Sequence, residues 1–231
     1  FDPSNLLSPQ RMIDPPKMDD TRLMRFPPSY KVVPIQPVLD WSAWNVQNNP
    51  VTEQTTAPGS GGDPAQGLAK AVEMCNNNGH CRKFDAGTMC PSYRVTRDEQ
   101  HLTRGRANTL RLALSGQLDG LQGEEALTSE AVRGSLDLCV SCKGCKRDCP
   151  TGVDMAKLKV EFLQHYKAKH GHTLKDKLVG QLPDYARHAA KVAPLLNLRD
   201  KVPLMAQLSE KLFGFSAKRS LPQWKSKHFF N

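Results

Sequence analysis

The chain has 231 residues, enough for one large domain or two small ones with a buried core. Its 32 lysines and arginines against 23 acidic residues give a formal net charge of +9, which we interpret as a solvated basic surface, with an acidic partner or an anionic membrane face as alternatives. The apolar runs are only a few residues long, which excludes a transmembrane helix.

Residues 1–63 are rich in proline and contain ten of the seventeen prolines in the chain. Proline removes a backbone donor and fixes φ, so we expect this segment to be extended and irregular. It also carries apolar side chains suited to wrapping over another part of the protein: Phe1, Leu6, Leu7, Met12, Ile13, Trp41 and Trp44. The stretch APGSGG, Ala57–Gly62, is typical of a flexible linker.

From Pro64 onward the apolar residues recur with helical spacing. Helices are predicted within 64–74, 97–118, 124–138, 153–170, 173–191 and 200–213, followed by a tail. The second of these places Leu102, Leu110, Ala113 and Leu114 on one face, and Gly171 is expected to end the fourth. Because no alternating strand pattern follows residue 63, we predict a mainly α fold.

All seven cysteines lie between positions 75 and 149. An odd number in one cluster argues against a disulfide framework and favours metal binding in a reducing compartment. We therefore expect a cytoplasmic location, either free or peripheral at the inner face of the membrane. The chain begins at Phe1 without a basic and apolar leader, so no signal peptide is expected, and its ends indicate a processed product or a piece of a longer chain.

The stretch CVSCKGCKRDCP contains Cys139, Cys142, Cys145 and Cys149, followed by Pro150. It matches the ferredoxin run C-x₂-C-x₂-C-x₃-C-P, in which the fourth cysteine serves a second cluster. Two-residue spacers let one loop curl three thiolates around one face of an iron–sulfur cluster. Pro150 is predicted to lie in the first turn of the next helix, where a missing N–H costs nothing.

Cys90 and Pro91 repeat the ending of this run. Cys90 can supply the fourth thiolate to Cys139, Cys142 and Cys145, which completes a Cys₄ site for a [4Fe-4S] cluster. Four thiolates also suit structural zinc, but zinc sites usually combine two C-x₂-C pairs rather than three cysteines in one loop with a Cys-Pro.

A second, incomplete site is predicted from Cys75, Cys81 and Cys149. Asn78 stands where a middle cysteine would fall. Three thiolates can hold a [3Fe-4S] cluster; alternatively Asn78, His80 or water completes a [4Fe-4S] site, or the cluster is absent and the cysteines are structural. We favour a surface role for His80, since it flanks Cys81 and its ring need not reach the cluster.

Basic residues surround both cysteine groups. Lys143, Lys146 and Arg147 could offset cluster charge, dock an acidic partner or be ordinary surface charge. For Arg104 and Arg106 we favour structural pairing over substrate contact.

These motifs resemble the helical iron–sulfur domain of glycolate oxidase and anaerobic glycerol-3-phosphate dehydrogenase iron–sulfur subunits. The positions that fit that pattern are Gly79, Cys81, Cys90, Pro91, Tyr93, Thr103, Arg104, Gly105 and Arg106. Asn78 departs from it by replacing a ligand cysteine. The C-x₅-C spacing is also similar to the three-iron site of succinate dehydrogenase iron–sulfur subunits.

The chain more closely resembles the middle region of a large fused FAD-linked oxidoreductase of the D-2-hydroxyglutarate or D-lactate dehydrogenase type. FDPSNLLSPQRMIDP looks like the end of its FAD-linked oxidase domain. The resemblance implies an end of the flavin domain and linker at 1–63, a helical ferredoxin-like iron–sulfur domain at 64–191, and a C-terminal helix and tail at 192–231. It further implies an FAD-binding domain before Phe1 and a cysteine-rich C-terminal domain after Asn231.

The function expected from this resemblance is electron transfer within an FAD-dependent 2-hydroxy-acid dehydrogenase. The flavin would take two electrons from a D-2-hydroxy acid, and the clusters would pass them singly to a quinone or a protein. The alternatives are a cluster-based redox or iron sensor and a metal-stapled nucleic-acid-binding module. Against the latter, aromatic residues make up only 6% and no helix carries a concentrated basic stripe, so no nucleic-acid partner is expected.

Overall fold

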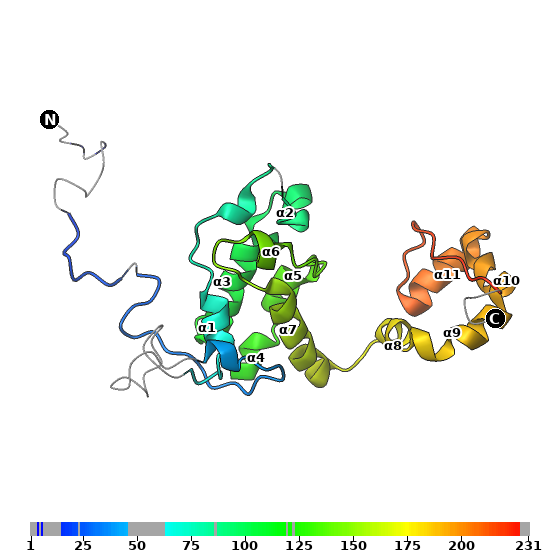
Figure 1. Cartoon of the computed structure of the whole chain (residues 1–231), viewed down its shortest axis with the longest axis horizontal. Helices are drawn as coiled ribbons and strands as arrows, with labels where there is room; N and C mark the ends of the chain where they lie inside the picture. The colour runs from blue at the N-terminus through cyan, green and yellow to red at the C-terminus, as the bar shows by residue number, and fades with distance from the viewer. Residues whose placement is uncertain are drawn as a thin grey trace. The chain divides into compact units, whose positions relative to one another are not determined.

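The computed structural model describes residues 4, 6, 15–22, 24–45, 63–85, 87–118, 120–121 and 123–226. Across these ranges the regular structure is helical and contains no β-strand, only an isolated bridge between Leu118 and Leu121. The predicted mainly α fold is therefore confirmed. The chain divides into two compact units, Phe1–Lys169 and His170–Asn231 (Figure 1).

Helix α3 (Thr103–Leu114) is the centre of the first unit. It contacts α1 (Leu68–Glu73), α4 (Gly123–Leu127) and α5 (Glu130–Asp137) (Figure 1). The apolar face predicted from sequence is buried, since Leu102, Leu110, Ala113 and Leu114 are each at most 2% exposed. Burial of this stripe against three helices stabilises the unit.

The single helix predicted over 124–138 is two helices, α4 and α5. Ser129 adopts an extended conformation between them, and its hydroxyl accepts a hydrogen bond from the Val132 N–H. Serine at this N-cap position satisfies a donor that the start of a helix leaves free, so it starts a new helix instead of continuing the old one.

Helix α7 (Met155–His170) follows the last cysteine and buries Met155, Leu158 and Phe162. The prediction that Pro150 lies in its first turn is wrong. A turn closed by the Gly152 N–H and the Cys149 carbonyl separates the proline from the helix. In contrast, Pro91 does occupy the first turn of α2 (Pro91–Thr96).

The described part of the proline-rich segment is irregular, as predicted. It contains three turns, closed by the N–H groups of Asp20, Met24 and Tyr30, and one short 3₁₀ turn, η1 (Ser42–Trp44). It packs over the helical core through Trp41 and Trp44, as predicted, and also buries Tyr30, Val32 and Ile35, whereas the predicted contact residue Leu6 is 78% exposed. The Glu161 carboxylate of α7 anchors it by accepting hydrogen bonds from the backbone N–H groups of Val38 and Leu39 and from the Trp41 indole. The predicted linker at 57–62 lies outside the described residues, as do Phe1, Leu7, Met12 and Ile13.

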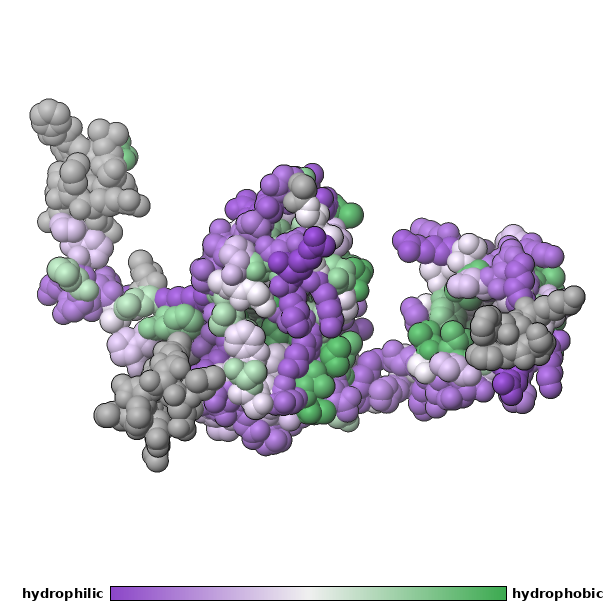
Figure 2. Space-filling model, in the orientation of Figure 1, coloured by the Kyte–Doolittle hydropathy of each residue, from purple (hydrophilic) through white to green (hydrophobic). Residues whose placement is uncertain are grey.

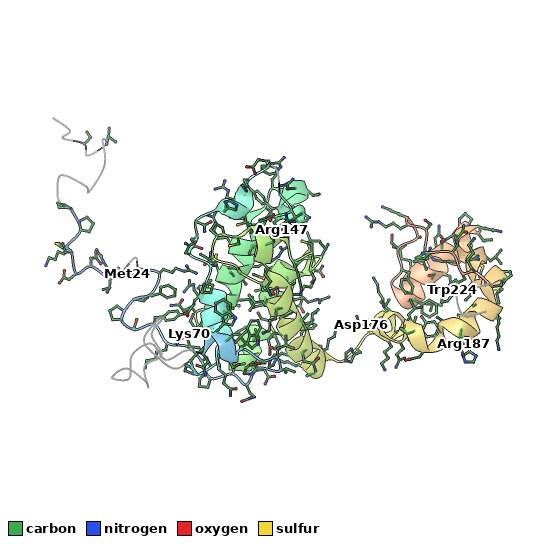
Figure 3. All side chains as sticks on the ribbon, viewed as in Figure 1. Met24, Lys70, Arg147, Asp176, Arg187 and Trp224 are labelled. Carbon is green, nitrogen blue, oxygen red and sulfur yellow. The ribbon has the colours of Figure 1, made fainter. Side chains whose placement is uncertain are left out.

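The second unit contains α8 (Leu174–Gly180), α9 (Leu182–Lys191), α10 (Ala193–Leu196) and α11 (Pro203–Phe213). A capping box between Thr173 and Asp176 starts α8. The rings of Tyr185 and Trp224 lie 6.4 Å apart, centroid to centroid, in a tilted arrangement; Trp224 is labelled in Figure 3. Few side chains of this unit are buried, and apolar residues show on its surface (Figure 2). The sequence predicts an iron–sulfur domain that extends to residue 191, and α8 and α9 fall within the second compact unit.

None of the helices within the described ranges combines the length and the apolar character needed to cross a bilayer.

Candidate iron–sulfur site

Four of the predicted ligands line one cavity: Cys90, Cys139, Cys142 and Cys145. Cys90 immediately precedes α2, Cys139 and Cys142 lie in the loop after α5, and Cys145 lies in α6 (Gly144–Asp148). The two half-motifs are more than forty residues apart in the sequence, and the fold brings them to the same cavity. This is the grouping that the cysteine spacing predicted.

The Cys90 thiol is held in a polar, buried environment. Cys90 is the extended N-cap residue of α2. Its sulfur lies 3.5 Å from the Ser92 hydroxyl and accepts a hydrogen bond from the Arg106 guanidinium at 3.3 Å. Burial alone would raise the pKa of Cys90, but the hydrogen bonds and the charge of Arg106 outweigh it and lower the pKa. The thiolate, which is the form that ligates metal, is therefore favoured here.

The loop from Cys139 to Cys145 curls through two residues with left-handed backbone conformation, Ser141 and Lys143, with φ of 53° and 58°. Such values are uncommon and costly for residues other than glycine. They stand between successive cysteines, where the chain must turn sharply for all three thiols to face one space. The strain therefore falls where a ligand-bearing loop requires it.

Asp148 joins the two half-motifs, a role that the sequence interpretation missed. Its carboxylate accepts hydrogen bonds from the Thr88 N–H at 2.6 Å, the Thr88 hydroxyl at 3.0 Å and the Met89 N–H at 3.3 Å. These bonds lower the pKa of Asp148. The only sequence signal was an acidic residue directly before the last cysteine of the run.

Gly144 lets the same segment approach α6 closely. A Cβ at Gly144 would lie 2.5 Å from the Thr88 side-chain oxygen and 3.1 Å from the Thr88 carbonyl carbon. Contacts that short do not occur, so the segment before Cys90 could not pack here against a larger residue.

The three cysteines predicted for a second cluster are less clearly grouped. Cys75 and Cys81 are buried, and burial, with a smaller contribution from the Cys75 charge, raises the pKa of Cys81 to about 11. The Cys149 sulfur lies 3.2 Å from the Thr151 hydroxyl. Burial by itself would raise the pKa of Cys149, but hydrogen bonds from this hydroxyl and from nearby backbone N–H groups outweigh burial and lower the pKa. Cys75 and Cys81 thus lie within electrostatic reach of each other, while Cys149 is a separate thiol prepared for ionisation.

The thiols do not converge on a point. Among the residues that the structure describes, no three His, Cys, Asp or Glu side chains are close enough to share a single metal ion. A zinc ion would require sulfurs about 2.3 Å away on all sides. Four thiols that line one cavity are the donor set that the ferredoxin-like cysteine spacing predicts for an iron–sulfur cluster.

Asn78 and His80 are engaged within their own loop. The Asn78 amide donates to the Asn76 side-chain oxygen at 2.6 Å, and its oxygen accepts from the His80 N–H at 2.8 Å. Both polar ends of Asn78 therefore help to fold the turn between Cys75 and Cys81.

The basic residues near the cysteines fall into distinct environments. Arg104 pairs with Glu99 at 2.8 Å, which confirms its predicted structural role. Lys146 pairs with Asp154 at 3.2 Å, and the largely exposed Arg147 lies beside Asp148 (Figure 3). Arg106 is different, because it is only 1% exposed and its guanidinium faces the cavity lined by Cys90.

The helical fold and the cysteine set are those expected of a helical iron–sulfur domain, and a family comparison agrees over part of the chain. Residues 71–153 match the 4Fe-4S dicluster domain family. That segment contains all seven cysteines. Iron–sulfur clusters are accordingly the cofactors supported for this part of the chain.

Individual proteins with similar sequences indicate a more specific class of iron–sulfur protein. The chain is 31% identical over 171 residues to the D-2-hydroxyglutarate dehydrogenase of Escherichia coli (strain K12), which covers 61% of this chain and 17% of that protein. The enzyme of the same name from Haemophilus influenzae is 29% identical over 176 residues, which covers 64% of this chain and 17% of that protein. The enzyme from Pseudomonas putida is 30% identical over 183 residues, which covers 62% of this chain and 18% of that protein. These matches fit an iron–sulfur region of a D-2-hydroxyglutarate dehydrogenase-type enzyme, which confirms the resemblance seen in the sequence.

The chain spans less than a fifth of the length of the curated relatives it matches. No solved structure matches it.

Proposed function

We propose that this chain is the electron-transfer module of an FAD-dependent D-2-hydroxy-acid dehydrogenase. The observation that carries the proposal is the cavity lined by Cys90, Cys139, Cys142 and Cys145. Iron–sulfur clusters ligated by cysteine thiolates accept and release single electrons. The relatives are named for D-2-hydroxyglutarate, so that acid, or D-lactate as a chemical neighbour, is the proposed donor.

The residues of this chain bind and tune the cluster rather than touch the substrate. Cys90, Cys139, Cys142 and Cys145 would hold a [4Fe-4S] cluster in the cavity, where Arg106 and Ser92 contact the Cys90 sulfur. Cys75, Cys81 and Cys149 would serve a second cluster, of the [3Fe-4S] or [4Fe-4S] type.

The proposed partners follow from the same assignment. Electrons would arrive from an FAD-binding domain in the same or a partner chain and leave toward a quinone or a protein, with a cysteine-rich C-terminal domain completing the enzyme. We propose a cytoplasmic location, free or peripheral at the inner face of the membrane.

The test is iron and acid-labile sulfide content, with EPR before and after dithionite, on the chain purified without air. About seven irons per chain with a three-iron signal in the oxidised protein would support two clusters, one of them [3Fe-4S]. About four irons with a silent oxidised spectrum would support the cavity cluster alone. Zinc without iron would overturn the electron-transfer proposal.

A further inference from the structure

Arg106 is a buried cation without a carboxylate partner in the part of the chain that the structure describes. Its guanidinium donates to the Ser135 carbonyl at 2.8 Å, to the Ser92 hydroxyl at 2.8 Å and to the Cys90 sulfur at 3.3 Å. No acidic side chain in the described ranges lies within ion-pair distance of it. Burying a guanidinium without a counter-anion is strongly unfavourable, because its hydration is lost and nothing replaces the missing charge. The one partner able to become negative is the Cys90 sulfur.

Lys159, on α7, is a second cation at the same site. It is half-buried, and its ammonium donates to the carbonyl oxygens of Cys139, at 2.6 Å, and Asp137, at 3.2 Å. It too has no ion-pair partner among the residues described. Two partly or fully buried cations, from α3 and α7, therefore contact residues on which the cavity cluster would be ligated, and the charge of Arg106 is felt at Lys159.

We propose that Arg106 and Lys159 are the counter-charges of the cluster held by Cys90, Cys139, Cys142 and Cys145, and that they raise its reduction potential. The inference rests on the proposed function, since it requires that cluster. It adds that the protein supplies two buried positive charges whose counter-anion is the thiolate-ligated cluster itself.

The sign of the effect follows from electrostatics. Reduction adds one negative charge to a cluster that is already anionic with its four thiolates. A nearby cation stabilises the reduced form more than the oxidised form, and a hydrogen bond to a ligand sulfur acts in the same direction. Arg106 supplies both effects, whereas Lys159 acts through charge alone, because its hydrogen bonds are to carbonyl oxygens.

The experiment is a potentiometric titration, followed by EPR, of the anaerobically purified 231-residue chain. The variants are Arg106→Met, Arg106→Lys and Lys159→Met. The matched control is Arg133→Met, which removes an equal charge from an exposed arginine that pairs with Glu130 and does not line the cavity. We expect a lower potential in Arg106→Met and Lys159→Met, a smaller decrease in Arg106→Lys, and no change in the control.

The direction of the shift separates charge compensation from a structural role. A cavity that merely opened to water would raise the potential, because water stabilises the more negative, reduced cluster. The inference would be overturned if Arg106→Met and Lys159→Met both kept the iron content of the wild type and both showed an unchanged or higher reduction potential. If Arg106→Met takes up no iron, Arg106→Lys and Lys159→Met decide by the same criterion. A wild-type chain that binds no iron would instead refute the proposed function.

Discussion

The Asp148 carboxylate accepts both the backbone N–H and the hydroxyl hydrogen bond of Thr88, at 2.6 and 3.0 Å. Asp148 lies directly before Cys149, the last cysteine of the run that begins at Cys139, and Thr88 lies two residues before Cys90. This contact therefore bridges the two halves of a cluster motif that the sequence separates. The contact holds Cys90 at the cavity that Cys139, Cys142 and Cys145 also line.

Removing this bridge is expected to lower cluster occupancy. In Asp148→Ala the segment before Cys90 loses all three hydrogen bonds, so the fourth thiol is no longer held at the cavity. We expect less iron per chain and faster loss of the visible absorption of the cluster in air. Asp85→Ala is the control, since that carboxylate pairs with Lys83 in the same region and is 65% exposed. Equal iron content in both variants would contradict the bridging role.

The two cysteine groups are expected to respond separately to substitution. Cys142 lines the cavity and Cys149 does not, so Cys142→Ser should remove about four irons and leave any second cluster. Cys149→Ser should spare the cavity cluster and remove only the signal of the second. Iron analysis and EPR of each variant check this, and loss of both signals in Cys149→Ser would show that the assignment is wrong.

Gly105 is expected to be irreplaceable for reasons of space. A Cβ there would lie 1.9 Å from the Glu99 carbonyl oxygen, where α3 meets the 3₁₀ turn η4 (Glu99–His101). Gly105→Ala should lower the free energy of unfolding by about 1–3 kcal/mol or more, through overpacking. Gly180 is a helical glycine with nothing within 4 Å of an added Cβ.

Gly180→Ala is therefore the matched control for Gly105→Ala. It should stabilise the protein by about 0.5–1 kcal/mol, because alanine favours the helix more than glycine does. Denaturant unfolding measures both, and a destabilisation of similar size in the two variants would argue against a specific close contact at Gly105.

Glu161 should make the anchoring of the proline-rich segment sensitive to acid. Burial by itself would raise the pKa of the Glu161 carboxyl. Hydrogen bonds from Trp41, Val38, Leu39 and His165 outweigh the effect of burial and lower this pKa. A lowered folded pKa means that the stabilisation is complete above the unfolded-state pKa, about 4.3, and is lost as the pH falls through the folded value. Unfolding free energy should therefore decline below about pH 4.3.

Glu161→Gln tests this carboxyl directly. At neutral pH the variant should lose about 1.5–3 kcal/mol, the value of a hydrogen bond to a charged group, and its stability should decline less steeply in acid. Glu125→Gln changes an exposed glutamate of α4 and should behave as the wild type does. Parallel acid profiles for wild type and Glu161→Gln would contradict the anchoring role.

The sequence alone determined what is local. Thiolate ligands of one cluster must be closely spaced, so the run from Cys139 to Cys149 and the Cys90-Pro91 pair indicated an iron–sulfur protein directly. The buried face of α3 was likewise predictable from local spacing, because residues three and four apart lie on the same side of a helix. The break at Ser129 and the delayed start of α7 after Pro150 were missed, since capping and turn closure depend on single hydrogen bonds.

Only the tertiary structure decided which distant groups meet. Nothing in the spacing indicates that Asp148 binds the Thr88 backbone, that Glu161 receives the chain near Trp41, or that Arg106 lies buried against Cys90. Each of these contacts joins an ionised side chain to a partner from another element. The contacts of Glu161 and Arg106 are strengthened by burial and by the exclusion of water, and all three contacts exist only once the helices have packed.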